Sequence, residues 1–153
     1  MIRPIDYAAL LLGLLMLIAA LVAAPARAAE PPPVLGAWLT PDGDGVVAIE
    51  PCGDALCGRI VGVTRDPGDP EPTDVHGAPQ CGLTIISDEH PDGDGTWLGD
   101  ITDPRTGNTY GAKLWLGEDG NLRLRGFVGL PFLGETQTWH PFKGRLAQHC
   151  EIV

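Results

Sequence analysis

Four cysteines, Cys52, Cys57, Cys81 and Cys150, have the widest chemical repertoire of any side chains in this sequence. A thiol–disulfide enzyme usually carries Cys-x-x-Cys at a helix N-terminus, which lowers the pKa of one thiol. Here four residues separate the first two cysteines, and a strand-like segment follows them. Zinc sites need closely paired cysteines or histidines at fixed offsets, and neither pattern is present. The spacing favours structural disulfides over a redox or metal-binding role.

Four cysteines allow three pairings. We favour Cys52 with Cys57, which closes a short loop ahead of a strand. The remaining pair, Cys81 with Cys150, then ties the C-terminal tail to the body of the domain. A cross-link over so long a loop contributes roughly 3–5 kcal/mol by chain-entropy arguments.

The sequence Pro-Asp-Gly-Asp-Gly occurs twice, at residues 41–45 and 91–95, and resembles half of a calcium loop. Calcium requires six or more oxygen ligands, usually including a bidentate glutamate, so neither copy suffices alone. Asp-Gly is also ordinary turn chemistry, which is the interpretation we favour. If both loops met at one end of the fold, their four carboxylates could bind one ion weakly.

Acid–base catalysis has little support in the sequence. Ser87 is the single serine, and it lies beside Asp88 and His90. Neighbours at a strand end point in different directions, so residues 87–90 are predicted to form a solvated turn. A nucleophile elbow and a phosphate-binding glycine loop are both missing. We expect no cofactor and no bound metal, and a non-enzymatic role is favoured, although a carboxylate pair for hydrolysis stays open.

The first 28 residues predict a secretory signal peptide. An uncharged run from Ala8 to Ala24 is followed by Ala26-Arg27-Ala28, which places small residues at a cleavage site after Ala28. The alternative is an uncleaved anchor, but this run is marginal for crossing ~30 Å of hydrocarbon. We therefore expect a periplasmic or secreted protein of the bacterial cell envelope, with no stable membrane span after cleavage.

The net charge of −10 argues against nucleic acid and anionic membrane surfaces as partners. Residues 29–35 are an extended, proline-rich lead-in, and residues 36–153 are predicted to form one domain. Short apolar runs alternate with turn clusters, which is typical of an all-β sandwich or barrel. The predicted strands are residues 35–40, 46–50, 56–63, 83–87, 96–102, 109–116, 121–127 and 135–142.

These eight strands predict a single antiparallel up-and-down β-barrel pinned by disulfides, because closure removes the exposed edges of a meander. An eight-stranded barrel holds either packed side chains or one small ligand. Residues 65–80 are too rich in proline for a strand, and their length predicts a mobile loop or a lid.

Four motifs resemble an exported bacterial family filed as domain of unknown function 2147. They are Gly36-Ala37-Trp38, the segment from Cys52 to Val61, the segment from Asp103 to Tyr110, and Gln137-Thr138-Trp139. The resemblance implies a small exported β-rich domain without a settled activity. Gly36-Ala37-Trp38 is also similar to the Gly-x-Trp that begins lipocalin barrels. This similarity implies a lipocalin-like barrel that resembles ligand carriers. A basic residue tends to follow the last-strand tryptophan in both families, whereas His140-Pro141 stand there in this sequence.

Aromatic side chains are the candidate ligand-binding residues of such a barrel: Trp38, Trp97, Tyr110, Phe127, Phe132 and Trp139. Glycine and proline interrupt the apolar segment 127–134, which predicts either a bulged strand packed into the core or a flap at the barrel mouth. We favour the packed strand, since apolar residues are mostly buried. Strand parity places Trp115 on the outer face, where it could mark a contact patch.

The leading functional hypothesis is an exported binding module that holds or presents a small apolar ligand in the envelope. The alternative is an envelope protein-interaction module with a filled barrel and an outer patch around Trp115. A hydrolase that uses two carboxylates is a third and weaker hypothesis. Whether the barrel interior is open or packed discriminates between the first two.

Overall fold

The computed structural model describes residues 30–153. The chain divides into two units, Met1–Glu30 and Pro31–Val153, and the second contains all the elements discussed below. The predicted signal peptide, residues 1–28, lies outside the described residues.

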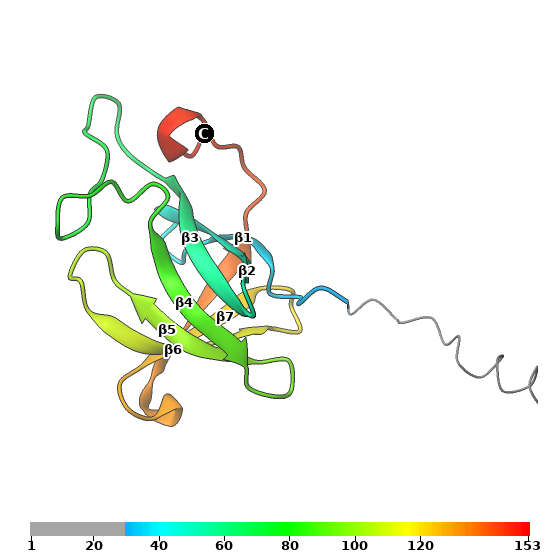
Figure 1. Ribbon diagram of the computed structural model, residues 1–153. Helices are drawn as coiled ribbons and strands as arrows, with labels where there is room; N and C mark the ends of the chain where they lie inside the picture. The colour runs from blue at the N-terminus through cyan, green and yellow to red at the C-terminus, as the bar shows by residue number, and fades with distance from the viewer. Residues whose placement is uncertain (1–29) are drawn as a thin grey trace, which may run out of the picture. The chain divides into compact units, whose positions relative to one another are not determined.

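Eight antiparallel strands form a closed barrel in which every strand pairs with its neighbours in the chain and β8 pairs with β1 (Figure 1). The fold class predicted from the sequence is therefore confirmed. The strands are β1 (Gly36–Leu39), β2 (Gly45–Cys52), β3 (Ala55–Val63), β4 (Thr84–Pro91), β5 (Trp97–Thr102), β6 (Thr109–Leu116), β7 (Leu122–Phe127) and β8 (Glu135–Pro141). Two short 3₁₀ helices, η1 (Pro131–Leu133) and η2 (Gln148–Cys150), complete the described structure.

Tight turns join the strands at one end of the barrel, which we call the closed end. The β6–β7 turn is built on Asp119, whose carboxylate accepts hydrogen bonds from the backbone N–H of Asn121 at 3.1 Å and from Arg123 at 2.7 Å. Gly120 follows with a φ of 75°, a conformation that glycine adopts without steric cost. The β2–β3 and β4–β5 turns lie at this same end, because alternate connections of a meander share an end.

The opposite end, which we call the mouth, carries the β1–β2, β3–β4, β5–β6 and β7–β8 connections. The two Pro-Asp-Gly-Asp-Gly loops are therefore separated, since the first joins β1 to β2 at the mouth and the second joins β4 to β5 at the closed end. The hypothesis that their four carboxylates share one calcium ion is wrong for this reason.

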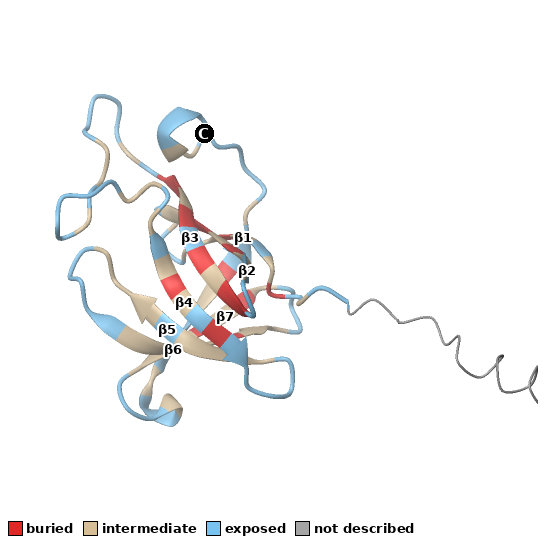
Figure 2. Ribbon diagram, in the orientation of Figure 1, coloured by how far each residue is buried: buried red, intermediate tan, exposed pale blue. Residues whose placement is uncertain are grey.

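The hydrophobic core fills the closed half of the barrel and extends into the mouth half as far as Val63, and Figure 2 shows buried positions along β3 and β4. Leu114, Leu122 and Ile86 are fully buried there. Trp38 is only 5% exposed, and its indole N–H donates to the backbone carbonyl of Val34 at 2.9 Å. The Gly-x-Trp segment thus anchors the lead-in to the closed end.

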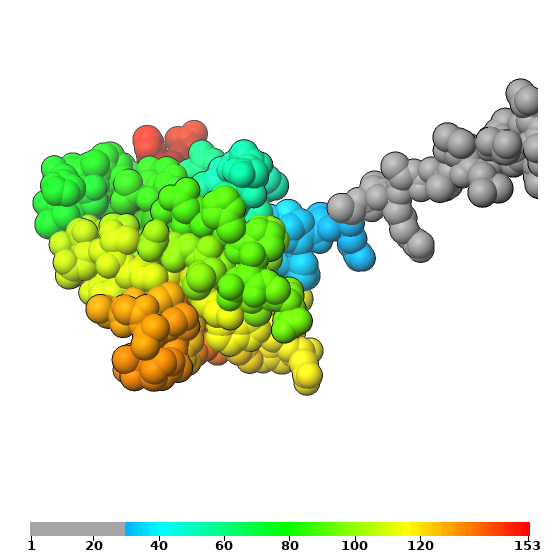
Figure 3. Space-filling view, turned by 60° about the horizontal axis from the view of Figure 1, so that its bottom comes forward, coloured from blue at the N-terminus to red at the C-terminus, as the bar shows by residue number. Residues whose placement is uncertain are grey.

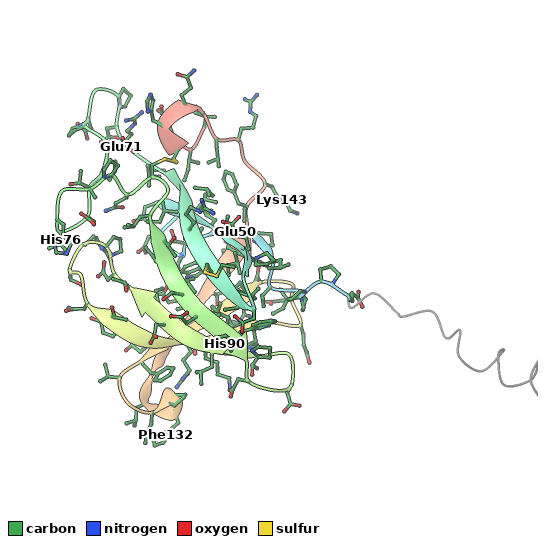
Figure 4. The ribbon with its side chains drawn as sticks, in the orientation of Figure 1. Glu50, Glu71, His76, His90, Phe132 and Lys143 are labelled. Carbon is green, nitrogen blue, oxygen red and sulfur yellow. A yellow bond between two sulfur atoms is a disulfide. The ribbon has the colours of Figure 1, made fainter. Side chains whose placement is uncertain are left out.

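Both disulfides join the pairs that the sequence spacing favoured. Cys52–Cys57 crosses the β2–β3 hairpin at the closed end, whereas Cys81–Cys150 ties η2 to the long β3–β4 connection. The second bond holds the C-terminal tail against the barrel wall (Figure 4). There Leu146 lies close to Gly62 and Val46, which explains why outward-facing Val46 is fully buried.

Strand β4 is longer and less regular than predicted. The predicted solvated turn at residues 87–90 is wrong, because these residues continue the strand to Pro91. The register shifts between Ser87 and His90, and Asp88 has a φ of 55°. A Cβ at Gly99 on β5 would lie 2.5 Å from the Ser87 carbonyl oxygen, so only glycine allows this bulge to approach.

Candidate functional site

The mouth half of the barrel encloses a cavity of about 840 Å³. Its volume lies within the range of about 300–1,000 Å³ that is typical of small-molecule sites. Gly126 on β7 shows why space remains at this level: it lines the cavity, and a Cβ at this position would meet no atom within 4 Å. A small residue on the inner face therefore leaves room that a larger side chain would fill.

The deep wall of the cavity is apolar. Alternate residues of the strands point inward, so the contributions come from several elements. They are Val47, Ile60, Ile85, Ile101, Leu124 and Trp139. Trp139 is 2% exposed, and its indole N–H donates to Gln137 Oε1 at 2.8 Å, so its one polar group is satisfied.

The mouth is polar and carries four carboxylates, Asp42, Asp44, Asp103 and Glu135, which we call the acidic rim. Asp44 accepts a hydrogen bond from Thr40 Oγ1 at 2.8 Å. Burial acts to raise the pKa of Asp103, but hydrogen bonds from the Arg105 backbone and side chain outweigh it, and the pKa falls below its usual value. Asp103 is therefore ionised at neutral pH.

The six aromatic residues proposed from the sequence occupy three different places. Tyr110, Phe127 and Trp139 line the cavity, and Trp139 is also part of the core. Trp38 belongs to the core at the closed end, and Trp97 packs against that core. Phe132 is 72% exposed on η1 and is not among the lining residues.

The segment from 128 to 134, here called the 128–134 loop, projects from the mouth. Figure 3 shows it as an orange protrusion, and Figure 4 shows Phe132 pointing away from the barrel. The apolar side chains exposed on it are Val128, Leu130, Phe132 and Leu133. The favoured prediction of a strand packed into the core is wrong here. The physical reason is that Pro131 starts a 3₁₀ turn, which carries the chain outward.

Arg125 on β7 holds the 128–134 loop in place. Its guanidinium donates to the carbonyl oxygens of Pro131 at 2.5 Å and Phe132 at 3.1 Å, and to Thr136 Oγ1 at 2.7 Å. Three bonds from one planar group fix the loop relative to the strand that precedes it. The exposed apolar surface is therefore presented in a defined position at the mouth.

The predicted outer patch around Trp115 has a different character. Trp115 is half-buried and pairs across the sheet with Arg123.

The long 65–80 loop reaches the cavity at its end, where Gln80 is one of the lining residues. Val75 of this loop donates its backbone N–H to the carbonyl oxygen of Pro104 at 2.8 Å. This contact places the loop beside the β5–β6 connection at the mouth.

Glu89 is a buried acid that the sequence analysis missed. Its side chain is fully buried opposite Leu56, and neither carboxyl oxygen has a hydrogen-bond partner in the described structure. Burial, with a smaller contribution from Asp100, raises its pKa to about 8. Glu89 is therefore largely protonated at pH 7. An acidic Ser-Asp-Glu-His run carries no signal for this, because such residues are usually exposed.

The described residues do not assemble a recognisable catalytic or metal site. In residues 30–153, no three His, Cys, Asp or Glu side chains are placed to hold a metal ion. Glu89 is the one fully buried carboxyl in that part of the chain. None of the helices described is long and apolar enough to cross a membrane.

Comparison with known proteins places this barrel in a structural class and a family. Its fold is similar to that of protein HP1028 from the human pathogen Helicobacter pylori, which is described as belonging to the lipocalin family. The TM-score is 0.61 at 15% identity, and the match covers 72% of this chain and 83% of that one. A comparison with curated proteins finds no match. A family model described as "Uncharacterized protein conserved in bacteria (DUF2147)" matches residues 36–141, which hold all eight strands, and the chain therefore belongs to this family.

Proposed function

We propose that this protein binds a small apolar or amphipathic molecule in the mouth half of its barrel and presents it in the bacterial cell envelope. The observation that carries the proposal is the cavity of about 840 Å³, with an apolar deep wall and a polar mouth. Burial of apolar ligand surface against that wall would supply the binding free energy, at roughly 25 cal/mol per Å². The lipocalin-like fold supports the same function.

The proposed location rests on the predicted signal peptide and on the disulfides. All four cysteines are paired, and disulfides persist in oxidising compartments such as the periplasm. We propose that residues 1–28 direct export and are removed. The barrel domain would then act in the periplasm or outside the cell.

Two alternatives are less well supported. An interaction module with a filled barrel does not require an open cavity, and Trp115 is only partly exposed. A glycosidase-type hydrolase needs two carboxyl groups about 5–9 Å apart across a cleft, whereas Glu89 is fully buried with an apolar cross-strand partner, Leu56. The cavity favours ligand binding over both.

Filling the cavity tests the proposal. Gly126→Leu adds a side chain where a Cβ meets nothing within 4 Å, so the barrel should fold with unchanged or higher thermal stability. Affinity for a neutral apolar fluorescent probe, such as a naphthylamine dye, should fall at least about tenfold, because the probe loses its volume and its contacts.

Ala37→Leu is the matched control, since it adds bulk at a partly exposed position of β1 that does not line the cavity. This variant should bind the probe as the wild type does. Native mass spectrometry of gently purified protein adds a second readout. The proposal fails if the wild type neither binds the probe nor carries an adduct, or if Gly126→Leu binds as tightly as the wild type.

A further inference from the structure

The charged side chains at the mouth are mostly carboxylates. The acidic rim draws one or two carboxylates from each of three elements: the β1–β2 loop, the β5–β6 loop and the start of β8. Among the described residues that line the cavity, Arg105 is the one cation. A ligand head group at the mouth therefore meets mainly negative charge.

Arg105 is already engaged within the rim. Its Nε donates to Asp103 Oδ1 at 3.3 Å, and its backbone N–H donates to the same oxygen at 2.9 Å. The salt bridges of the described chain include none from Asp42, Asp44 or Glu135. Three rim carboxylates thus have no ionic partner among residues 30–153.

The cavity beneath the rim orients an amphiphile. Its deep wall is apolar, so a hydrocarbon chain would lie inward and the head group would remain at the mouth. Tyr110 lines the same cavity and is the second residue of β6, a strand that begins at the mouth. The face of an aromatic ring attracts cations, and particularly quaternary ammonium groups.

We propose that the cavity selects amphiphiles with a cationic ammonium head group over amphiphiles with an anionic head group of the same chain length. This inference rests on the proposed function and names the ligand class. Several unpaired carboxylates near an exposed head group give a preference on the order of tenfold at low salt. Salt should weaken it, because the Debye length falls from about 10 Å at 0.1 M to about 3 Å at 1 M.

The experiment measures displacement of the neutral dye by three ligands that share a decyl chain: decyltrimethylammonium, decanoate and decanol. All three are used below the concentrations at which they form micelles. Wild-type protein should rank the ammonium ligand first, decanol second and decanoate last. The ratio between the first and last should shrink toward unity as sodium chloride rises.

Two double variants with equal net charge separate the rim from the general acidity of the protein. Asp42→Asn with Glu135→Gln removes two rim charges, both from exposed side chains. Asp54→Asn with Asp94→Asn removes two exposed charges from turns at the closed end. In the rim variant the ratio of ammonium to decanoate affinity should fall toward unity, and the closed-end variant should keep the wild-type ratio.

The outcomes distinguish this inference from the proposed function. If decanol and the dye bind but decanoate binds as tightly as the ammonium ligand, the cavity is a site without charge selectivity and the inference is overturned. Equal losses in both double variants would also overturn it, since long-range charge would then be the cause. If no ligand binds at all, the proposed function itself has failed.

Discussion

At the scale of single residues, Glu89 is the most unusual feature of the barrel. A buried carboxyl without a hydrogen-bond partner is expensive when ionised, because low-dielectric surroundings disfavour charge. Its pKa of about 8 means that the folded state retains a proton that the unfolded chain releases near pH 4.5. The bulge of β4, whose backbone packs against Gly99 of β5, places Glu89 at this buried position.

Glu89 should make stability depend on pH. The contribution of Glu89 to the free energy of unfolding is fully present below about pH 4.5. As the pH rises further, the free energy of unfolding falls by about 1.4 kcal/mol per pH unit until the pH passes about 8. Glu89→Gln should remove most of this slope and should be the more stable protein at pH 8. Urea unfolding at pH 5 and pH 8 measures the effect.

Glu50→Gln is the control, because Glu50 is partly exposed and forms an ion pair with Arg59 on the surface. Exposed ion pairs contribute little to stability, so this variant should keep the wild-type slope. Parallel pH profiles for wild type and Glu89→Gln would contradict the assignment of a raised pKa.

At the scale of elements, the β7–β8 connection differs from the tight turns at the closed end. It exposes four apolar side chains, yet Arg125 bonds its carbonyl groups and holds it in one place. Val128 and Leu133 both line the cavity and face solvent, so the loop joins the mouth to the outer surface. Its position depends on one side chain from the neighbouring strand.

Arg125→Ala should loosen the 128–134 loop while the barrel stays folded. The three hydrogen bonds lost are partly exposed, so the free energy of unfolding should fall by only about 1–2 kcal/mol. Amide hydrogen exchange should become faster in residues 128–134. Arg123→Ala, on the same strand but paired with Asp119 at the closed end, should leave that exchange unchanged. Unaltered protection of the loop in Arg125→Ala would show that other contacts hold it.

At the scale of the whole molecule, closure and cross-linking divide the barrel into two halves. The closed half carries the fully buried core residues Leu114 and Leu122 and the Cys52–Cys57 bond. The other half carries the cavity, and its Cys81–Cys150 bond holds the tail across Val46 and Gly62. A small domain with part of its interior open has less core to stabilise it, which gives the cross-links a larger share of its stability.

The two disulfides should contribute unequally. Cys81 and Cys150 are separated by 69 positions and Cys52 and Cys57 by 5. Loop-closure entropy assigns about 4 kcal/mol to the first bond and about 2 kcal/mol to the second. Urea unfolding of Cys81→Ser with Cys150→Ser should therefore show the larger loss. Equal losses in the two double variants would contradict loop length as the factor that decides how much each disulfide stabilises the protein.

The sequence by itself determined the strands, their order and the family. Alternation and turn chemistry are local, so the β6 and β7 strands and the Asp119-Gly120 turn could be predicted from neighbouring residues. The end of β4 could not be predicted in this way, because the bulge in β4 depends on Gly99 in the next strand. Cysteine spacing also favoured the disulfide pairs, since their separations constrain which loops can close.

Only the tertiary structure decided whether the interior is open and which residues surround it. Trp38 and Trp139 are both buried in the core, yet only Trp139 also lines the cavity, because strands that are far apart in sequence meet around each of them. Contacts between distant strands also explain three other features: the space beside Gly126, the burial of Glu89 and the proximity of the acidic rim residues. Each depends on contacts across the closed barrel, which no local pattern in the chain encodes.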